Sequence, residues 1–301
     1  MQIPNRIPTP PLATRDGVSP SYLWLPEGRW DNLLDFLLTQ FPDVSEQQWH
    51  ARIAKHEVVD ARGTILAANS AVKRGMCIFY YREIDDEVTI PYQEQILYQD
   101  ENLLVVDKPH FLPVIPGGRF LHETLLVRLK KSSGNNQLTP IHRLDRETAG
   151  VILFSQKTET RGAYQSLFQQ RKVNKIYHAL APHLSQQEFP LTYRSKMIDA
   201  EKFFVMEETP GEPNAETHIT VIERRGENDL YELHPSTGKR HQLRVHLASL
   251  GAPIINDTFY PIALPCNGDD FSAPLQLLAK SISFTDPLSG GYRQFTSTKT
   301  L

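Results

Sequence analysis

The ten residues 141–150, IHRLDRETAG, place one acid, Asp145, between Arg143 and Arg146. A guanidinium close to a carboxylate favours the ionised acid, and an ionised carboxylate can act as a nucleophile. The more ordinary interpretation is an exposed ion pair that adds little to stability. These ten residues alone do not distinguish the two interpretations, so the rest of the chain has to.

A second group of basic residues lies within KRHQLRVH, which contains no acid. Its charged or titratable members are Lys239, Arg240, His241, Arg244 and His246. Such a cluster can bind phosphates, although a solvated helix face is an equally ordinary interpretation. The two histidines are not at the i, i+4 spacing of a zinc helix, and no HExxH glutamate accompanies them. We therefore expect no metal site.

A third group is QQRKVNKIY, which brings Arg171, Lys172 and Lys175 just ahead of Tyr177. Alternate residues of a strand share a face, so Lys175 and Tyr177 are expected on the same side of a sheet. The phenol ring would then stand beside cations, although a tyrosine buried in a core is the commoner case.

The chain has no glycine-rich phosphate loop, no GxSxG elbow and no dinucleotide fingerprint. These absences argue against nucleotide hydrolysis, serine hydrolases and NAD-dependent redox chemistry. A carboxylate nucleophile acting on a polyanionic substrate needs no such apparatus, so we expect no cofactor.

The composition is that of a globular protein, with 301 residues, 40% of them hydrophobic and 22% charged. The net charge is only -3, so affinity for nucleic acid must come from local clusters of Lys and Arg. No apolar run is long enough for a membrane span and no signal core is visible, which predicts a cytoplasmic protein. Cys77 and Cys266 are far apart and predict neither a disulfide nor a zinc site.

The elements that must position these groups fall into three predicted parts. Residues 1–20 are expected to form a flexible or surface-laid arm. Residues 21–84 are expected to form a small module of two helices followed by short strands, the second helix beginning at a Ser45–Gln48 capping box. Residues 85–301 are expected to form the larger domain, entered through the acidic linker REIDDEV.

Strand patterns outnumber helix patterns in the larger domain. The strands are NLLVVDKP, VILFS, VNKIYHALA, THITVIER, LYELHP and LLAKSISF, and the helices lie at 122–131, 158–172 and 238–251. A doubly wound parallel sheet would need a crossover helix between most strands. We therefore predict an α+β fold with a mixed, mainly antiparallel sheet.

The stretch HRLDRETAG resembles the HRLDxxTSG signature of the RluA-type pseudouridine synthases, with Ala149 where serine is usual. Further resemblance to the family's pattern lies in NLLVVDKP at 102–109, KIYHALA at 175–181, GKRHQLRVHLASLGAPIINDTFY at 238–260 and LLAKSISFTDPLSG at 277–290. Leu278 replaces a histidine in the last block. The matches follow the family's order along the chain.

The resemblance implies the pseudouridine synthase catalytic fold and an isomerase that converts uridine to pseudouridine in rRNA or tRNA. Asp145 would be the nucleophile, attacking at the ribose anomeric carbon or at the base, which then detaches, turns and rejoins through carbon 5. Tyr177 would stack on the flipped uracil and help to move the carbon-5 proton, and Arg244 would pair with Asp145. The expected RNA contacts are Lys108, His142, Arg143, Arg146, Lys175, Lys239, Arg240 and His241. The expected partner is structured RNA, with no membrane or obligate protein partner and a monomeric enzyme.

Residues 21–84 loosely resemble the alpha-L RNA-binding domain, but Ser45-Glu46-Gln47-Gln48 stands where that domain usually has Ser-Arg. The module could instead be a packing partner or a weak steering surface. Two other functions use the same residues. One is RNA binding without catalysis, suggested by Ala149 and Leu278, and the other is phosphoester hydrolysis by a His142–Asp145 pair.

Overall fold

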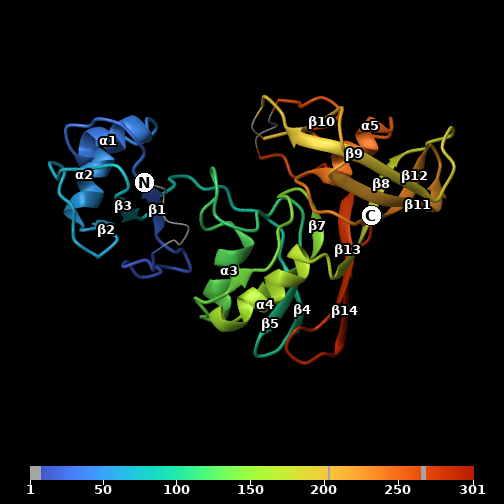
Figure 1. Cartoon of the computed structure of the whole chain (residues 1–301), viewed down its shortest axis with the longest axis horizontal. Coiled ribbons are helices and arrows are strands. Elements are labelled where there is room, and N and C mark those ends of the chain that lie inside the picture. The colour runs from blue at the N-terminus through green and yellow to red at the C-terminus, as the bar shows by residue number, and fades with distance from the viewer. Residues whose placement is uncertain (1–7, 203, 266–268) are drawn as a thin grey trace. The chain divides into compact units, whose positions relative to one another are not determined.

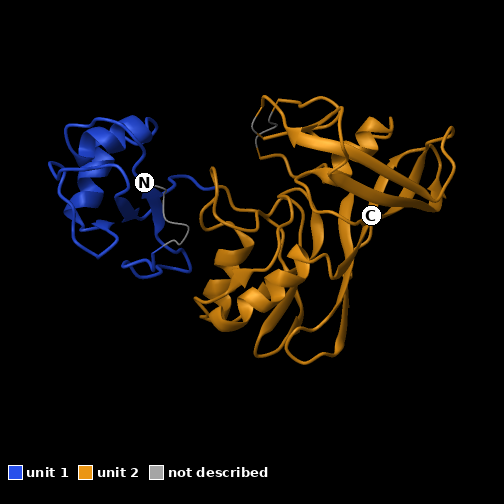
Figure 2. Cartoon of the chain, in the orientation of Figure 1, with its two compact units in different colours: residues 1–87 blue, residues 88–301 orange. Residues whose placement is uncertain are grey.

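The computed structural model describes residues 8–202, 204–265 and 269–301 (Figure 1). The chain forms two compact units, residues 1–87 and 88–301 (Figure 2). We expected the boundary at residue 84. Within the described ranges, no helix is both long enough and apolar enough to cross a bilayer. Cys77 is a buried free thiol, and Cys266 lies outside the described residues.

Unit 1 is a three-stranded antiparallel sheet with two helices. The sheet has the order β1–β3–β2, with β1 Ser21–Trp24, β2 Val58–Asp60 and β3 Cys77–Tyr80, and the helices are α1 Leu33–Gln40 and α2 Glu46–Ala54. The predicted capping box begins α2, since Ser45 Oγ accepts from Gln48 N at 3.2 Å and Ser45 N donates to Gln48 Oε1 at 2.9 Å. The fully buried Trp49 then fixes α2 on the core.

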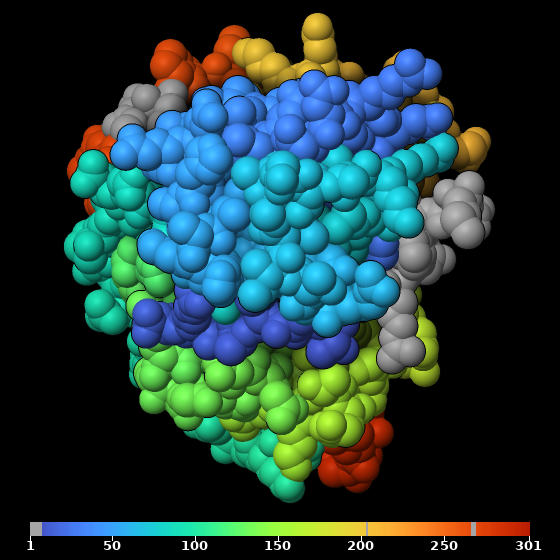
Figure 3. Space-filling model, turned by 90° about the vertical axis from the view of Figure 1, so that its left-hand side faces the viewer, coloured from blue at the N-terminus to red at the C-terminus, as the bar shows by residue number. Residues whose placement is uncertain are grey.

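The described part of the predicted arm packs on unit 1 (dark blue in Figure 3). Tyr81 Oη donates to Ala13 O at 2.7 Å, and the Arg15 guanidinium lies 3.9 Å from the centre of the Tyr81 ring. Arg15 also pairs with the buried Glu57. Leu12 packs against the buried cluster of Val59, Cys77 and Phe79. From residue 8 onward the segment is therefore tied to unit 1.

Unit 2 is built on a sheet of eleven described strands, nine of which form the order β10–β9–β11–β12–β8–β13–β7–β5–β4. The strands are β4 Gln95–Gln99, β5 Leu103–Lys108, β6 Thr139–Pro140, β7 Ala149–Ser155, β8 Val173–Pro182, β9 Leu191–Asp199, β10 Met206–Thr209, β11 Ala215–Arg225, β12 Asn228–Pro235, β13 Leu277–Thr285 and β14 Tyr292–Thr296. Among the described pairs, only β7 and β13 run parallel. The predicted mainly antiparallel α+β fold is confirmed.

The two halves of this sheet carry different helices (Figure 1). The helices are α3 Leu125–Ser133, α4 Thr158–Gln169 and α5 Gln242–Ser249. In β5, Leu104 and Val106 pack in the cluster that contains α3, whereas Leu103 and Val105 pack in the cluster that contains α4. This alternation buries both faces of the strand. The third core packs α5 against β8, β11 and β12, and the pocket described below lies near β8.

Candidate active site

Asp145 lies on the loop between β6 and β7, which two apolar side chains anchor. Ile141 packs in the α4 cluster and Leu144 in the α3 cluster, and Ile141 N donates to Leu153 O at 2.9 Å. Thr148 N donates to Asp145 O at 3.2 Å, which tightens the turn. The Asp145 side chain is 17% exposed and lines a pocket of about 840 Å³. The loop thus holds a carboxylate at a solvent-accessible cavity.

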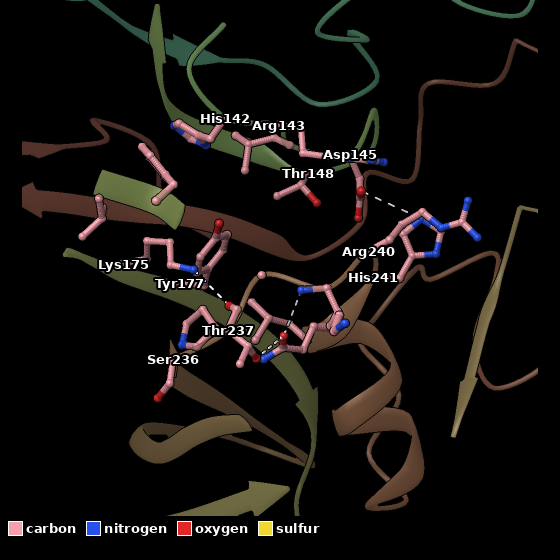
Figure 4. A pocket seen from close by; sticks show the side chains of 18 of the residues that line it. His142, Arg143, Asp145, Thr148, Lys175, Tyr177, Ser236, Thr237, Arg240 and His241 are labelled. Atoms are coloured by element: carbon pink, nitrogen blue, oxygen red, sulfur yellow. Dashed lines mark hydrogen bonds and ion pairs between the residues drawn. The ribbon is translucent and has the colours of Figure 1, made fainter. Parts of the chain in front are cut away.

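Three segments distant in sequence supply most of the remaining pocket wall. They are the end of α4 with the start of β8, the turn between β12 and α5, and the first turn of α5. Figure 4 shows the side chains of Asp145, Thr148 and Tyr177 pointing into the same space. The fold therefore brings an acid and an aromatic ring to one cavity.

Arg244 is the buried cation of the site, with 1% of its side chain exposed. Asp257 holds one edge of the guanidinium, because Nε donates to Oδ2 at 2.8 Å and Nη2 donates to Oδ1 at 2.6 Å. The remaining nitrogen, Nη1, is buried without a hydrogen bond. It lies 3.7 Å from Asp145 Oδ2 and 3.7 Å from Glu147 Oε2. Arg244 therefore has a spare donor aimed at two carboxylates.

The surroundings keep Arg244 charged. Burial opposes the charge, but the hydrogen bonds to Asp257 and the charges of Asp257, Asp145 and Glu147 outweigh burial and raise the pKa of Arg244 above its ordinary value. Because two hydrogen bonds to Asp257 hold one edge of the planar guanidinium, the remaining nitrogen, Nη1, points in a fixed direction.

Tyr177 lies on β8, where it packs against both the α3 and the α5 clusters. Burial, with a contribution from the negative charge of Asp145, raises the pKa of the phenol above its ordinary value. The ring is therefore a fixed, neutral aromatic surface at neutral pH. The site offers a flat apolar face, a carboxylate and a guanidinium within one cavity.

Three comparisons with known proteins bear on this arrangement. The family model for RNA pseudouridylate synthases matches residues 102–249. A Synechocystis protein described as an uncharacterized RNA pseudouridine synthase is 30% identical over 239 residues, 78% of this chain and 81% of that protein. The dual-specificity RNA pseudouridine synthase RluA of Salmonella typhi is 34% identical over 207 residues, 66% of this chain and 90% of that protein. The chain belongs to the RluA-type RNA pseudouridine synthases.

A solved structure agrees with this membership. Human RNA pseudouridylate synthase domain containing 4 superimposes with a TM-score of 0.53 at 28% identity, over 68% of this chain and 88% of that one. The expected family and fold are confirmed, and with them the expected reaction class. RNA pseudouridine synthases are isomerases that convert uridine in RNA to pseudouridine.

In this pseudouridine synthase, Lys108 does not reach the pocket, contrary to our expectation that it contacts RNA. The side chain is fully buried, and Nζ donates to Pro109 O, Leu112 O and Arg146 O at 2.8 to 3.0 Å. Burial lowers the pKa of Lys108 to about 7, against the charges of Glu147 and Asp145. With its three donors in use, Lys108 holds the loop of Asp145 from inside.

The geometry also contradicts a phosphate-binding or hydrolytic role for His142. Its Nε2 accepts from Leu153 N at 3.1 Å, and its ring stacks on Phe168 with centroids 4.7 Å apart. Burial and the charge of Lys175 lower the pKa of His142 to about 3. The neutral ring has its basic nitrogen occupied, so it neither attracts a phosphate nor serves Asp145 as a base.

His241 is also neutral at neutral pH, so it adds no positive charge to the pocket. Its side chain is 8% exposed, and burial lowers its pKa to about 4 although Asp145 lies close. Its Nε2 is 3.8 Å from Asp145 Oδ1, as the dashed line in Figure 4 marks. The structure thus places His241 against the nucleophile candidate.

The remaining predicted RNA contacts lie at the rim of the pocket or beside it. Arg143 and Lys239 are exposed and line the pocket. Lys175 donates to Thr237 O at 3.0 Å, and burial lowers its pKa to about 8. Arg240 donates to Asp199 Oδ1 at 2.8 Å.

Arg146 is the one of these predicted contacts that does not line the pocket. It lies 3.6 Å from Glu147 Oε1, and its guanidinium is 5.1 Å from the centre of the Phe120 ring.

The two departures from the family signature are partners in the sheet. Ala149 and Leu278 face each other in the β7–β13 register, and both are fully buried. Neither lines the pocket. The next residue, Gly150, has φ +113°, and a Cβ there would lie 2.2 Å from Ala279 O. The two departures therefore lie in the packing of β7 against β13 and not in the wall of the pocket.

The sequence analysis did not assign a site role to Asp257, Glu147 or Arg171. A signal for Asp257 existed, because it lies within the quoted block at 238–260 that resembles the family's pattern. Glu147 lies within the quoted signature stretch, and Arg171 lines the pocket at the end of α4.

Proposed function

We propose that this enzyme isomerises uridine in structured RNA with Asp145 as the nucleophile, Arg244 as its ionic partner and Tyr177 as the stacking surface. The observation that carries the proposal is the Asp145 carboxylate in a pocket, 3.7 Å from the anchored Arg244 guanidinium. A guanidinium at this distance can pair with the carboxylate and hold it in place.

The reaction begins with extrusion of the target base, because a stacked uridine cannot reach a carboxylate in a cavity. Extrusion costs a few kcal/mol. Stacking on an aromatic ring returns about 1–3 kcal/mol per base, and Tyr177 supplies that ring. Phosphate contacts at the rim stabilise the extruded state further.

Asp145 then attacks the ribose anomeric carbon or the uracil ring. The bond between the anomeric carbon and N1 breaks, the base turns, and a bond from the anomeric carbon to carbon 5 forms. The bond between Asp145 and the substrate also breaks, which restores the carboxylate. The proton on carbon 5 leaves and N1 gains one, so the RNA keeps its mass and length. Because the Tyr177 phenol stays protonated, we assign it stacking and not proton removal.

The substrate is expected to be a stem-loop of rRNA or tRNA, held by phosphate contacts to Arg143, Arg171 and Lys239. All three line the pocket and are exposed. Among the described residues, none of the three forms an ion pair with an acid. We also propose that the enzyme is cytoplasmic and monomeric, which cell fractionation and gel filtration would test.

Unit 1 is proposed to be an accessory module related to alpha-L domains. Four of its arginines, Arg15, Arg52, Arg62 and Arg74, pair with acids of the same unit. These pairs reduce the positive charge that the module offers to RNA.

The test measures tritium release from RNA that carries label at carbon 5 of its uridines. We expect release by the wild type, and a loss of at least about a thousandfold in Asp145→Asn, as for removal of other enzymic nucleophiles. Asp43→Asn, at an exposed site in unit 1, is the matched control and should release label normally.

Equal release by wild type and Asp145→Asn would refute the assignment of the nucleophile. If the wild type bound RNA but released no label from any cellular RNA pool, the non-catalytic alternative would replace the proposal.

A further inference from the structure

The two oxygens of Asp145 face different nitrogen atoms. Oδ2 lies 3.7 Å from Arg244 Nη1, and Oδ1 lies 3.8 Å from His241 Nε2. Both separations are longer than a hydrogen bond, as is common in active sites without substrate. The direction of each donor therefore matters, and for His241 it depends on which ring nitrogen carries the proton.

The other nitrogen of His241 bears on this question through its contact with Tyr260. Tyr260 Oη accepts a hydrogen bond from Met206 N at 2.8 Å, and it lies 2.9 Å from His241 Nδ1. Because the backbone N–H already donates to the phenol oxygen, the phenol proton is free to donate to Nδ1. An accepting Nδ1 leaves the single proton of a neutral imidazole on Nε2, which faces Asp145.

The phenol that makes this bond is itself held firmly. Tyr260 packs in a buried cluster with Met206 and Val245. The turn that carries it is fixed by Asp257, whose Oδ1 accepts from Phe259 N at 2.8 Å and Tyr260 N at 3.1 Å. Asp257 is also the partner of Arg244. One carboxylate thus supports both groups that approach Asp145.

The backbone of His241 is unusual as well. It has φ 55° and ψ 16° at the N-terminus of α5, in the left-handed region that few residues other than glycine adopt. In this conformation the imidazole ring lies beside the ring of Phe259, with centroids 5.6 Å apart, and lines the pocket. Strained residues of this kind concentrate at functional sites.

We propose that His241 is a positioning residue for the reaction: Tyr260 fixes its tautomer, and its Nε2–H sets the rotation of the Asp145 carboxylate opposite Arg244. The inference rests on the proposed function, in which Asp145 is the nucleophile. It also replaces the role in phosphate binding that we expected for His241.

The charges around the ring are consistent with this role. His241 faces the acids Asp145 and Asp257 and the cations Arg240 and Arg244. Burial outweighs the acids and keeps the imidazole neutral at neutral pH. A neutral ring has one proton to place, which is why Tyr260 can decide where it lies.

A matched pair of substitutions separates positioning from packing. In His241→Gln the amide nitrogen can lie near the former Nε2, facing Asp145. In His241→Asn the shorter side chain places its nitrogen near the former Nδ1, facing Tyr260. Asparagine tolerates the left-handed backbone better than glutamine does, so backbone strain would favour the asparagine variant. Positioning predicts the opposite order.

The measurement is the single-turnover rate of label release, with RNA affinity measured in parallel. We expect His241→Asn to slow the rate about 10- to 100-fold, the usual cost of a misplaced group, with unchanged RNA affinity. His241→Gln should recover most of that loss. His218→Asn, at an exposed position on β11, is the control and should leave the rate unchanged.

A second readout needs no substrate. Nitrogen NMR of the histidine rings should show the proton of His241 on Nε2 in the wild type, and a mixture of tautomers in Tyr260→Phe. If a His241 variant does not fold, this measurement still decides the question.

A wild-type proton on Nδ1, or a His241→Asn rate equal to the wild-type rate, would overturn the inference. A loss of RNA affinity in His241→Asn without a loss of rate would return His241 to the RNA-binding role. The proposed function fails separately, if Asp145→Asn retains the wild-type rate.

Discussion

Each unit buries one arginine in a different way. In unit 1, Arg52 Nε lies 3.2 Å from Glu83 Oε2, and Glu83 is 46% exposed. The Arg52 guanidinium is 4.8 Å from the centre of the Trp49 ring. In unit 2, Arg244 is held by the fully buried Asp257. Of these two arginines, Arg244 alone has a buried guanidinium nitrogen that makes no hydrogen bond, and this nitrogen faces the carboxylates of Asp145 and Glu147.

This difference in pairing distinguishes Arg52, which has a structural role, from Arg244, which also contributes to the pocket. Arg52 combines ring stacking with an ion pair at the surface, and such a pair adds little to stability. Arg244 has both members of its pair out of water, which is costly unless each stays paired. The arrangement leaves one donor directed at the pocket, where Asp145 lies.

The largest effect should come from breaking the buried pair. We expect Asp257→Asn to lower the free energy of unfolding of unit 2 by about 3–5 kcal/mol, because it leaves the Arg244 charge unpaired. Glu83→Gln should cost unit 1 about 1 kcal/mol or less, because that pair is half in water.

The two units can be followed separately. The three tryptophans, Trp24, Trp30 and Trp49, all belong to unit 1, so tryptophan fluorescence reports that unit. Hydrogen exchange of the β8 amides reports unit 2. Equal costs for Asp257→Asn and Glu83→Gln would break the distinction between the two arginines.

A smaller effect should appear as a pH dependence confined to unit 2. The pKa of His142 is about 3 in the folded protein and 6.5 in its ordinary state, so the unfolded chain binds more protons between these values. Stability is therefore lost as the pH falls below 6.5, by about 2 kcal/mol at pH 5 for this residue.

In His142→Gln the amide oxygen can still accept from Leu153 N, but it does not titrate. We expect the loss of stability between neutral pH and pH 5, measured by exchange of the β8 amides, to be about 2 kcal/mol smaller than in the wild type. Part of the loss should remain, because burial also lowers the pKa of His241 and of His246. The histidines of unit 1, His50 and His56, are exposed and provide the comparison. An unchanged slope in His142→Gln would contradict the burial argument.

The smallest effect concerns RNA affinity. Each lost phosphate contact should reduce the slope of log affinity against log salt by about 0.7 for single-stranded RNA. We expect this reduction for Arg171→Gln and Lys239→Gln at the pocket rim. Arg29→Gln and Lys73→Gln, at exposed positions of unit 1, are the matched pair and should change nothing. A reduced slope for the unit 1 pair would show that unit 1 takes part in RNA binding.

The sequence predicted the parts of the site that a short motif carries. The signature and the tyrosine strand identified Asp145 and Tyr177, and the basic helix identified Arg244, which the fold brings to one cavity. Strand alternation also predicted the mainly antiparallel sheet. These features depend on local pattern, so a single sequence contains them.

Features that exist only in the folded chain, such as contacts between distant residues and burial, could not be predicted in this way. Lys108 looked available to RNA because its three carbonyl partners come together only in the folded chain, two from residues 109–112 and the third from Arg146. The histidines 142 and 241 were expected to contact RNA because their burial, which keeps them neutral, is invisible in sequence. The helix α5 begins at Gln242 and not at Gly238, since His241 adopts the left-handed conformation.

The signature stretch contains residues that the fold requires as well as residues that could react, and Gly150 is one that the fold requires. A side chain there would meet the Ala279 carbonyl, so this letter of HRLDRETAG records how closely two strands approach. A motif search that weights all nine residues equally therefore tests for the close approach of two strands and for the reactive acid at the same time. A duplicated copy of this gene could lose its acid and still keep the glycine, because the sheet would go on requiring it.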